Sequence, residues 1–222
     1  KISTTFDWYY KRTNDLLLNV QIPRQTGFQS RLENLGQVTN VGVEFSINSS
    51  NITTDRFQWS TNFNISHNEN TVRDLGGVDF IDIVDPSATG QGGPGGRVML
   101  GENAPVFVGV QYLGTWKSQE EIDASGQTGQ DVGGPRFKDT DGDGQVNESD
   151  FEVLGSPEPD FTFGLGNTVS FKNWDLNFFF TGTYGYEVFN CLTQTDFFGR
   201  SERTKFKSTL DRWTPENRDS DF

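Results

Sequence analysis

Two neighbouring runs decide the fold: PDFTFGLGNTVSF at residues 159–171 and WDLNFFFTGTYGY at residues 174–186. In both runs, apolar side chains alternate with small or polar ones, and Lys172 and Asn173 separate the runs. A period of two predicts a strand with one apolar face. Two such strands joined by a short polar turn predict an antiparallel hairpin. Its apolar positions are Phe161, Phe163, Leu165, Val169, Phe171, Trp174, Leu176, Phe178, Phe180, Tyr184 and Tyr186.

The length of these runs indicates a membrane. Each has 13 residues, more than the usual globular strand of about 5–6 and enough for the roughly 9–11 that a tilted strand needs to cross a bilayer. The apolar positions include no Lys, Arg, Asp or Glu, and the other face is small and polar, as a barrel lumen can be. A hairpin of a soluble β-sandwich shows the same alternation and is the alternative.

The same pattern recurs earlier in the chain, at residues 2–10, 40–48 and 57–68, so that five long strands are predicted. Short turns are predicted at 49–55 and 172–173, and long excursions at 13–35, 71–158 and after 186. Residues 14–35 are too irregular for a strand and contain too many Pro and Gly signals for a helix. The excursion at 71–158 has room for small strands of its own, and such long loops are usually functional.

Short turns at one end and long loops at the other are typical of bacterial outer-membrane barrels. We therefore predict an all-β fold, an antiparallel transmembrane β-barrel segment with short periplasmic turns and long extracellular loops. Five strands are fewer than the eight or so of the smallest such barrels, and open edges are not tolerated in lipid. Both ends of the chain look cut, which predicts that further strands come from elsewhere.

The composition excludes several classes of protein. The 222 residues carry a net charge of −13, which argues against nucleic-acid binding. No apolar run approaches the 18 residues of a transmembrane helix. Cys191 is the single cysteine, so no internal disulfide forms, and no histidine lies near it in sequence to support a nucleophile.

Motifs along nearly the whole chain resemble the SusC/RagA-type TonB-linked outer-membrane transporters of Bacteroidetes. The matching pieces are YYKRTNDLLL at 9–18, IP at 22–23, TGF at 26–28, NLG at 34–36, NVGVE at 40–44, WSTNFNISHN at 59–68, FKDTDGDG at 137–144, LGSPEPDF at 154–161 and RWTPEN at 212–217. The family's plug domain and its other strands have no counterpart here, which leaves energy coupling outside the chain.

The resemblance implies that residues 1–222 are part of the β-barrel domain of a TonB-dependent receptor, a plugged barrel of about 22 strands. It implies import of oligosaccharides or peptides, captured with a SusD-like surface lipoprotein and driven by TonB through regions absent here. The implied location is the outer membrane of a Gram-negative, Bacteroidetes-like cell, in contact with lipid. Transport is implied rather than an enzyme activity.

Residues 139–150 fit a twelve-residue, EF-hand-like calcium loop. The expected ligands are Asp139, Asp141, Asp143, the backbone carbonyl of Gln145, Asn147 and Asp150, with Gly144 at the sharp turn. Asp150 replaces the usual Glu, and Gly and Pro signals flank the loop where helices would stand. Calcium is therefore the possible cofactor, in a structural role in a long extracellular loop. The alternative is an Asp- and Gly-rich surface turn that binds nothing tightly.

Other residues support weaker hypotheses. Aromatic residues in the excursions are candidates to contact a nutrient or the SusD-like lipoprotein, which would act as a lid: Phe107, Tyr112, Trp116, Phe197 and Phe198. His67 lies on the apolar parity, and Trp174, Tyr184 and Tyr186 are expected in interfacial aromatic girdles.

Two alternative functions remain open: a secreted or surface calcium-stabilised β-rich module that binds glycan, and a secreted carbohydrate-active enzyme, which needs paired carboxylates facing one cleft.

Overall fold

The computed structural model describes residues 1–21, 30–84, 95–190 and 207–221. The chain divides into two compact units. Unit 1 contains Lys1–Ile81, Val98–Pro105 and Ser156–Glu187, and unit 2 contains Asp82–Arg97, Val106–Gly155 and Val188–Phe222. None of the helices among the described residues is long and apolar enough to cross a membrane.

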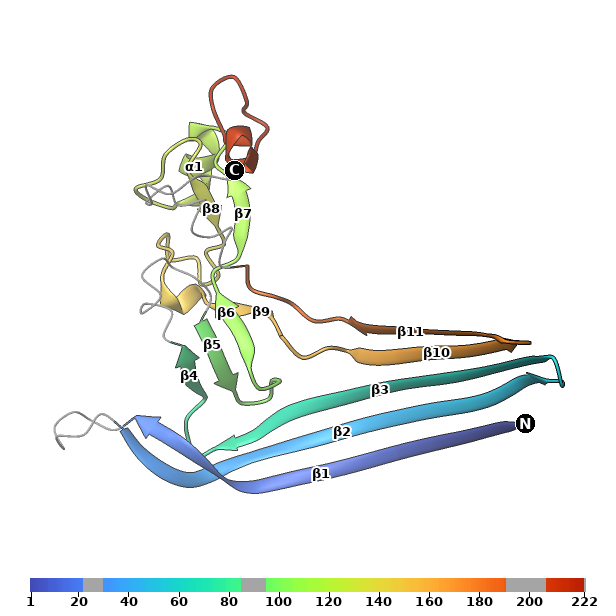
Figure 1. Ribbon diagram of the computed structural model, residues 1–222. Helices are drawn as coiled ribbons and strands as arrows, with labels where there is room; N and C mark the ends of the chain where they lie inside the picture. Colours follow the sequence, from blue (N-terminus) through green and yellow to red (C-terminus); the bar gives the residue numbers. More distant parts are fainter. Residues whose placement is uncertain (22–29, 85–94, 191–206, 222) are drawn as a thin grey trace. The chain divides into compact units, whose positions relative to one another are not determined.

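Unit 1 is built on one sheet of five long antiparallel strands (Figure 1). These are β1 (Ile2–Gln21), β2 (Ser30–Thr53), β3 (Phe57–Leu75), β10 (Phe161–Phe171) and β11 (Trp174–Tyr184), in the order β1-β2-β3-β10-β11. The five predicted strands and the hairpins β2–β3 and β10–β11 are confirmed. β3 and β10 pair directly, although the long excursion between them separates the two strands in the sequence.

The register gives the sheet two chemically different faces. Phe6, Phe45, Ile65 and Phe163 are successive cross-strand partners on one face, which we call the apolar face. The adjacent row, which runs from Asp7 through Glu44 and Ser66 to Thr162, lies on the opposite, polar face. The period-2 pattern of the sequence is thus continuous across all five strands.

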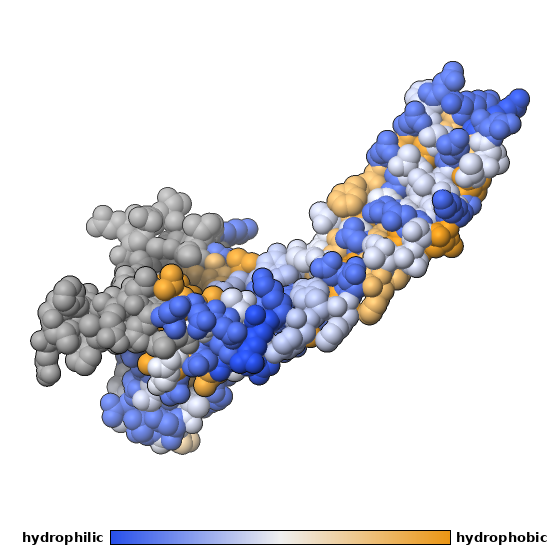
Figure 2. All heavy atoms as spheres, turned by 90° about the horizontal axis from the view of Figure 1, so that it is seen from below, coloured by the Kyte–Doolittle hydropathy of each residue, from blue (hydrophilic) through white to orange (hydrophobic). Residues whose placement is uncertain are grey.

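Side chains of the apolar face are exposed rather than packed into a core. Phe180 is 60% exposed and Trp174 is 79% exposed. In Figure 2, hydrophobic side chains lie at the surface of the sheet of long strands. A large exposed apolar area marks an interaction with membrane or protein, and the exposure does not match the filled interior of the β-sandwich alternative.

The first two strands are longer than their sequence pattern predicts. Residues 14–21 belong to β1 and 30–35 to β2, so the prediction of an irregular connection over 14–35 was wrong for those residues. Asp15 has a φ of 58°, and the β1–β2 register shifts between Thr13 and Leu16 and again between Leu16 and Leu17. Such bulges break the alternation on which the prediction depends. Residues 22–29 lie outside the described residues.

A second bulge shortens the turn between β2 and β3. Pairing shifts between Ser50 and Ile52, and β2 continues to Thr53, so the predicted turn at 49–55 shrinks to residues 54–56. The β10–β11 turn matches its prediction, since strand pairing closes at Phe171 and Trp174. Lys172 takes a φ of 55° there, as two-residue hairpin turns require.

The small core of unit 1 lies at the end of β3 away from its turn with β2. Val72 and Leu75 are fully or almost fully buried. The segment 98–105 is bonded there, because Val72 N donates to Glu102 O at 3.0 Å and Gly101 N donates to Val72 O at 2.9 Å. The long strands are therefore anchored at this end, while most of their length remains accessible.

The excursion between β3 and β10 carries small elements of its own, as the sequence suggested. One sheet has the order β4-β5-β6-β9, formed by β4 (Phe80–Val84), β5 (Gly95–Met99), β6 (Val106–Gly109) and β9 (Glu152–Gly155). A second pairs β7 (Tyr112–Thr115) with β8 (Pro135–Phe137), beside α1 (Gln119–Ser125) and the 3-10 helices Glu148–Asp150 and Lys207–Asp211. Among the described residues of unit 2, the buried apolar ones are Val106, Val108, Trp116 and Ile122.

Candidate functional site

The acidic loop in unit 2 follows β8 and is held by its own aspartates. Asp139 Oδ1 accepts from Gly142 N at 2.7 Å, and Asp139 Oδ2 accepts from Gly144 N at 2.9 Å. Asp141 Oδ1 accepts from Asp143 N at 3.1 Å, and Asp143 Oδ1 accepts from Gln145 N at 2.7 Å. Aspartate favours such local turns because its short side chain reaches backbone N–H groups a few residues ahead.

These turns bring three of the predicted ligands together. One carboxylate oxygen from each of Asp139, Asp141 and Asp143 lies within 4.8 Å of the others. Gly144 makes the bend possible, with a φ of 83°. A Cβ at this position would lie 2.7 Å from the carbonyl oxygen of Gly126, so a glycine is needed here for both space and conformation.

Asp150, predicted as the twelfth ligand, has a different place. Its side chain is completely buried. Asp150 Oδ2 accepts from Asn147 N at 2.8 Å, and Oδ1 accepts from Thr140 N at 2.7 Å and from Asp141 N at 3.4 Å. The Asn147 N–H contributes most to holding the pKa of Asp150 below its usual value, against the opposing effect of burial. Asp150 thus ties the two ends of the loop together and stands outside the cluster of three carboxylates.

The two remaining predicted ligands contact each other. Asn147 Nδ2 donates to Gln145 O at 3.4 Å, and Asn147 Oδ1 accepts from Ser149 N at 2.8 Å, capping the short 3-10 helix. Both oxygens, Gln145 O and Asn147 Oδ1, therefore already accept a hydrogen bond. Each keeps a second lone pair, which is the capacity that a bound cation would use.

The aromatic candidates separate by burial. Trp116 is only 1% exposed, and the guanidinium of Arg136 lies 5.0 Å from its ring centre. It belongs to the core of unit 2, so its proposed contact with a nutrient or lid was wrong. Phe107 is half-buried on β6. Phe197 and Phe198 lie outside the described residues.

Tyr112 is the most accessible described residue of that aromatic set. It is 47% exposed, and its ring lies 5.7 Å from that of Phe137. Its hydroxyl donates to Asp221 O, and Lys117 Nζ bonds the Asp221 carboxylate at 2.9 Å. Partial burial, and secondly the charge of Asp221, raise the pKa of Tyr112. The tyrosine hydroxyl is thus occupied in fastening the C-terminal segment to β7.

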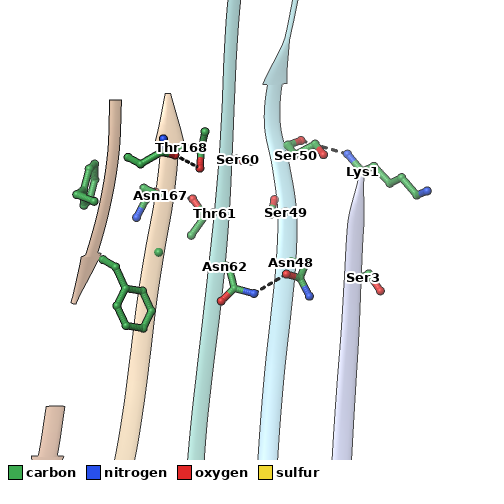
Figure 3. Close-up of a pocket in the computed structure, with 14 residues that line it drawn as sticks. Lys1, Ser3, Asn48, Ser49, Ser50, Ser60, Thr61, Asn62, Asn167 and Thr168 are labelled. Carbon is green, nitrogen blue, oxygen red and sulfur yellow. Dashed lines mark hydrogen bonds between the residues drawn. The ribbon is translucent and has the colours of Figure 1, made fainter. Parts of the chain in front are cut away.

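The polar face of the long sheet was not selected by the sequence reasoning, although it is rich in amides and hydroxyls. Asn62 Nδ2 donates to Asn48 Oδ1 at 2.5 Å, and Thr168 Oγ1 donates to Asn177 Oδ1 at 2.6 Å. A hollow of ≈ 610 Å³ lies beside these side chains; it is lined by residues of the polar face such as Asn48, Asn62 and Thr168, and also by Ser49, Thr61, Asn167 and Phe178 of the apolar face. Figure 3 shows Asn48, Asn62 and Thr168 on their strands. The alternating Asn and Ser residues of β3 could have indicated this polar face in the sequence. The sequence does not show the cross-strand register, which brings these side chains together.

Two aromatic rings lie on glycines of this polar face. The Tyr9 ring occupies the space that a side chain at Gly42 would need, and its hydroxyl donates to Asn68 Oδ1 at 3.0 Å. Phe179 covers Gly164 and Gly166 in the same way, within 3.1 and 3.4 Å of the Cβ positions. An aromatic ring over a strand glycine restores packing that the glycine lacks.

On the apolar face, aromatic residues gather at both ends of the long strands. At the turn end, the rings of Phe57 and Phe171 meet edge-on at 6.4 Å, next to Trp174. At the other end, Tyr184 stacks on Phe161 at 5.1 Å. The side chain of His67 bonds the backbone carbonyl of Asp160.

Comparisons with known proteins agree along the whole chain, although no protein-family model matches it. It is 52% identical over 223 residues to TonB-dependent receptor P26 of Formosa agariphila, an alignment that covers 100% of this chain and 22% of that protein. It is 35% identical over 225 residues to TonB-dependent receptor P3 of the same organism, with 100% and 22% covered. TonB-dependent receptor SusC of Bacteroides thetaiotaomicron is 30% identical over 182 residues, with 80% and 17% covered.

The chain therefore spans about a fifth of the length of these relatives. A solved structure, the RagAB peptide transporter, matches 99% of this chain and 23% of the solved chain with a TM-score of 0.75 at 22% sequence identity. The RagAB peptide importer in its open-open state matches with a TM-score of 0.74 at 21% identity. At such identities the match establishes the fold, which is mostly β with antiparallel sheets that are not closed among the residues that the structure describes.

Proposed function

Since the chain belongs to the SusC/RagA-type family of TonB-dependent receptors, we propose that it forms one wall of a transporter that imports nutrients across the outer membrane of a Bacteroidetes-type bacterium. The observation that carries the proposal is the match of the whole chain, at 52% identity, to a segment of one receptor. The family comprises transporters rather than enzymes. A match along a receptor also speaks against the separate glycan-binding module and the carbohydrate-active enzyme.

The dimensions of the apolar face support a place in the bilayer. On β3, its residues run from Phe57, in the turn-end aromatic row, to His67, which pairs with Val43 opposite Trp8. These ten residue steps cover about 33 Å along a strand, or about 25 Å along the membrane normal at a tilt of ~40°. Outer-membrane barrels have an apolar band of about 25 Å. The next outward position on β3 is Glu69, a charged residue where such a band would end.

The polar face would then line the interior of the barrel. Its amides and hydroxyls are bonded to one another across strands, as in the pairs Asn62–Asn48 and Ser66–Thr162. A wall of this kind offers hydrogen bonds, and Asp7 and Glu44, cross-strand partners on the same face, add negative charge to it. The short turns at 54–56 and 172–173 would face the periplasm, and unit 2 would belong to the extracellular loops.

The partners follow from the family. We propose a SusD-like surface lipoprotein as the lid, and TonB as the source of energy through parts of the receptor outside this chain. The substrate class is an oligosaccharide or a peptide. The relative SusC and the RagAB structures support a SusD-like partner, and the RagAB structures, which are of a peptide transporter, support a peptide substrate.

Import is tested with the complete receptor in its host. Cells lacking the receptor are offered fluorescent oligosaccharides and peptides, and uptake is compared with cells carrying the intact receptor or one without its TonB-binding region. We expect uptake of at least one class only with the intact receptor, and co-purification of a lipoprotein. Equal uptake in all three strains, with the receptor absent from the outer-membrane fraction, would contradict the proposal.

We also propose that the acidic loop binds calcium through Asp139, Asp141 and Asp143, with Gln145 O and Asn147 completing the shell. Calcium takes six to eight oxygen ligands, and three carboxylates within 4.8 Å repel one another without a cation. Asp150 keeps the loop closed from outside the shell. The ion would pin the loop in place, as a structural cofactor.

Calorimetry of the complete receptor at millimolar calcium checks this proposal. Asp141→Ala should abolish the binding heat, whereas Asp131→Ala, an exposed acidic residue of the same unit, should leave it unchanged. Extracellular sites of this type bind at about 10⁻⁴–10⁻³ M. Equal heats for wild type and Asp141→Ala would leave the loop as an ordinary acidic turn.

A further inference from the structure

One cross-strand row of the apolar face is polar. Ser49, Thr61 and Asn167 are successive partners on β2, β3 and β10, with Ile2 at one end of the row and Phe178 at the other. The row stands four residues from the aromatic row of Phe57, Phe171 and Trp174. The rows on both sides are apolar except for Thr4 on β1, so the row forms a polar strip within the apolar face.

The polar strip is linked by side-chain hydrogen bonds that converge on Asn167. Trp59 Nε1 and Thr61 Oγ1 donate to Asn167 Oδ1 at 3.0 Å and 2.7 Å. Asn51 Nδ2 donates to Thr61 Oγ1 at 2.7 Å, and Ser49 Oγ donates to Asn51 Oδ1 at 2.7 Å. Figure 3 shows Thr61 and Asn167 next to each other on their strands.

The hydrogen bonds of the polar strip leave the N–H donors of Asn167 unused. An indole nitrogen can only donate, so Trp59 fixes the carboxamide of Asn167 with its oxygen toward the strip. The NH₂ group of Asn167 then has no partner among the residues that the structure describes, although the side chain is half-buried. Uncompensated N–H groups are costly in hydrocarbon. A partner with acceptor oxygens is needed.

We propose that this strip binds the ester carbonyl oxygens of phospholipids in the leaflet on the turn side, and so draws the hydrocarbon boundary inward at this wall. The inference rests on the proposed membrane location. Glycerol esters fit because they offer only acceptors, and the unbonded N–H groups of Asn167 can only donate. One class of partner therefore satisfies every unbonded N–H of Asn167.

The order of residues along the strands matches the layers of that leaflet. Cations come first: Lys172 Nζ lies 5.2 Å from the centre of the Phe171 ring, and Lys172 N bonds Arg56 O at 3.0 Å, which joins the two turns. The aromatic row follows, then Asn167, then the apolar row of Phe63, Leu165 and Phe180.

The depths agree with this order. Four residues from the aromatic row correspond to about 13 Å along the strand, or about 10 Å of depth at a tilt of ~40°. Headgroup layers are about 5–8 Å thick on each side. The aromatic row marks the edge of the apolar band, so ester groups that reach Asn167 lie about 10 Å inside that edge, displaced in the direction in which a short apolar wall thins a bilayer.

Depth measurement by electron paramagnetic resonance tests the inference on the complete receptor in diester phospholipid vesicles. A nitroxide is placed in the polar row by Phe178→Cys and in the hydrocarbon by Phe163→Cys, after replacement of native cysteines. We expect the label at 178 at ester depth and the label at 163 deeper. Asn167→Leu, or diether lipids that lack carbonyls, should move the label at 178 inward, whereas Asn177→Leu on the polar face should not.

The possible failures are distinct. Labels at 178 and 163 at the same hydrocarbon depth, unaffected by Asn167→Leu, overturn the inference and leave the membrane location intact. A label at 178 shielded from both oxygen and aqueous reagents, with spin–spin broadening between receptors, overturns it in favour of a second copy covering the strip. Two labels exposed to water contradict the proposed function itself.

Discussion

Adjacent phenylalanines on β11 offer a direct test of which face meets lipid. Phe179 and Phe180 are 64% and 60% exposed and lie on opposite faces of the same strand. Phe180 stands six residues from Trp174 and four from Tyr184, near the middle of the apolar band. Replacing each by arginine and by leucine separates charge from packing, since both substitutions remove the ring.

The charge effect is the free energy of unfolding lost with arginine minus that lost with leucine. At position 180 we expect a positive charge effect of at most about 2–4 kcal/mol, the cost of an arginine at the bilayer midplane on the lipid side, because Phe180 stands only two residues from the polar strip. At position 179 we expect about 0 kcal/mol, because the polar face is hydrated and the arginine stem can lie over Gly164. Packing losses, which the leucine variants measure, cancel in the difference.

Urea unfolding of the complete receptor in phospholipid vesicles, followed by tryptophan fluorescence, supplies the four values. The unsubstituted receptor in the same vesicles is the reference, and the amount of each variant in the outer membrane of cells provides a second readout. A charge effect at 179 equal to or larger than that at 180 would refute the assignment of faces, and with it the membrane location of this sheet.

Three further predictions concern unit 2. Gly144→Ala should destabilise the acidic loop more than Gly142→Ala, because both need a positive φ but only the first places a Cβ 2.7 Å from Gly126 O; hydrogen exchange within residues 139–150 measures the difference, and equal effects would contradict it. The lowered pKa of Asp150 means that its contribution is present above the ordinary value of 3.8 and is lost as the pH falls through the lower folded value. Exchange protection of the Asn147 N–H should therefore fall in acid, and Asp150→Asn should remove this dependence. Trp116→Ala should cost about 3–5 kcal/mol and raise exchange in unit 2 while β2 and β3 stay protected; equal loosening of both would count against a separate core.

The strands could be predicted from sequence wherever alternation is unbroken. Residues 161–171 and 174–184 show an unbroken period of two, which a helix does not produce, and the turn between them is local. The extension of β1 past Thr13 could not be predicted, because Asp15 adopts a positive φ and shifts the register. A bulge is stabilised by the neighbouring strand, and that partner is not visible in a local pattern.

The candidate metal centre likewise has a part that could be predicted from the sequence and a part that could not. Asp139, Asp141 and Asp143 converge through turns only two to five residues long, so their spacing in the sequence was sufficient. The role of Asp150 depends on the N–H of Thr140, ten residues away, and on burial. Trp116 was mistaken for an accessible aromatic because its cover, from Arg136, comes from another strand.

The Tyr9 ring on Gly42 has an evolutionary consequence. Any larger residue at 42 would overlap the ring, so a change there becomes tolerable only after Tyr9 has been replaced by something smaller. Once the ring is gone, Asn68 loses the hydroxyl that it accepts from, and the neighbouring amides have to rearrange. Among related receptors, positions 9 and 42 should therefore vary as a pair, with the substitution at 9 preceding that at 42 in each lineage.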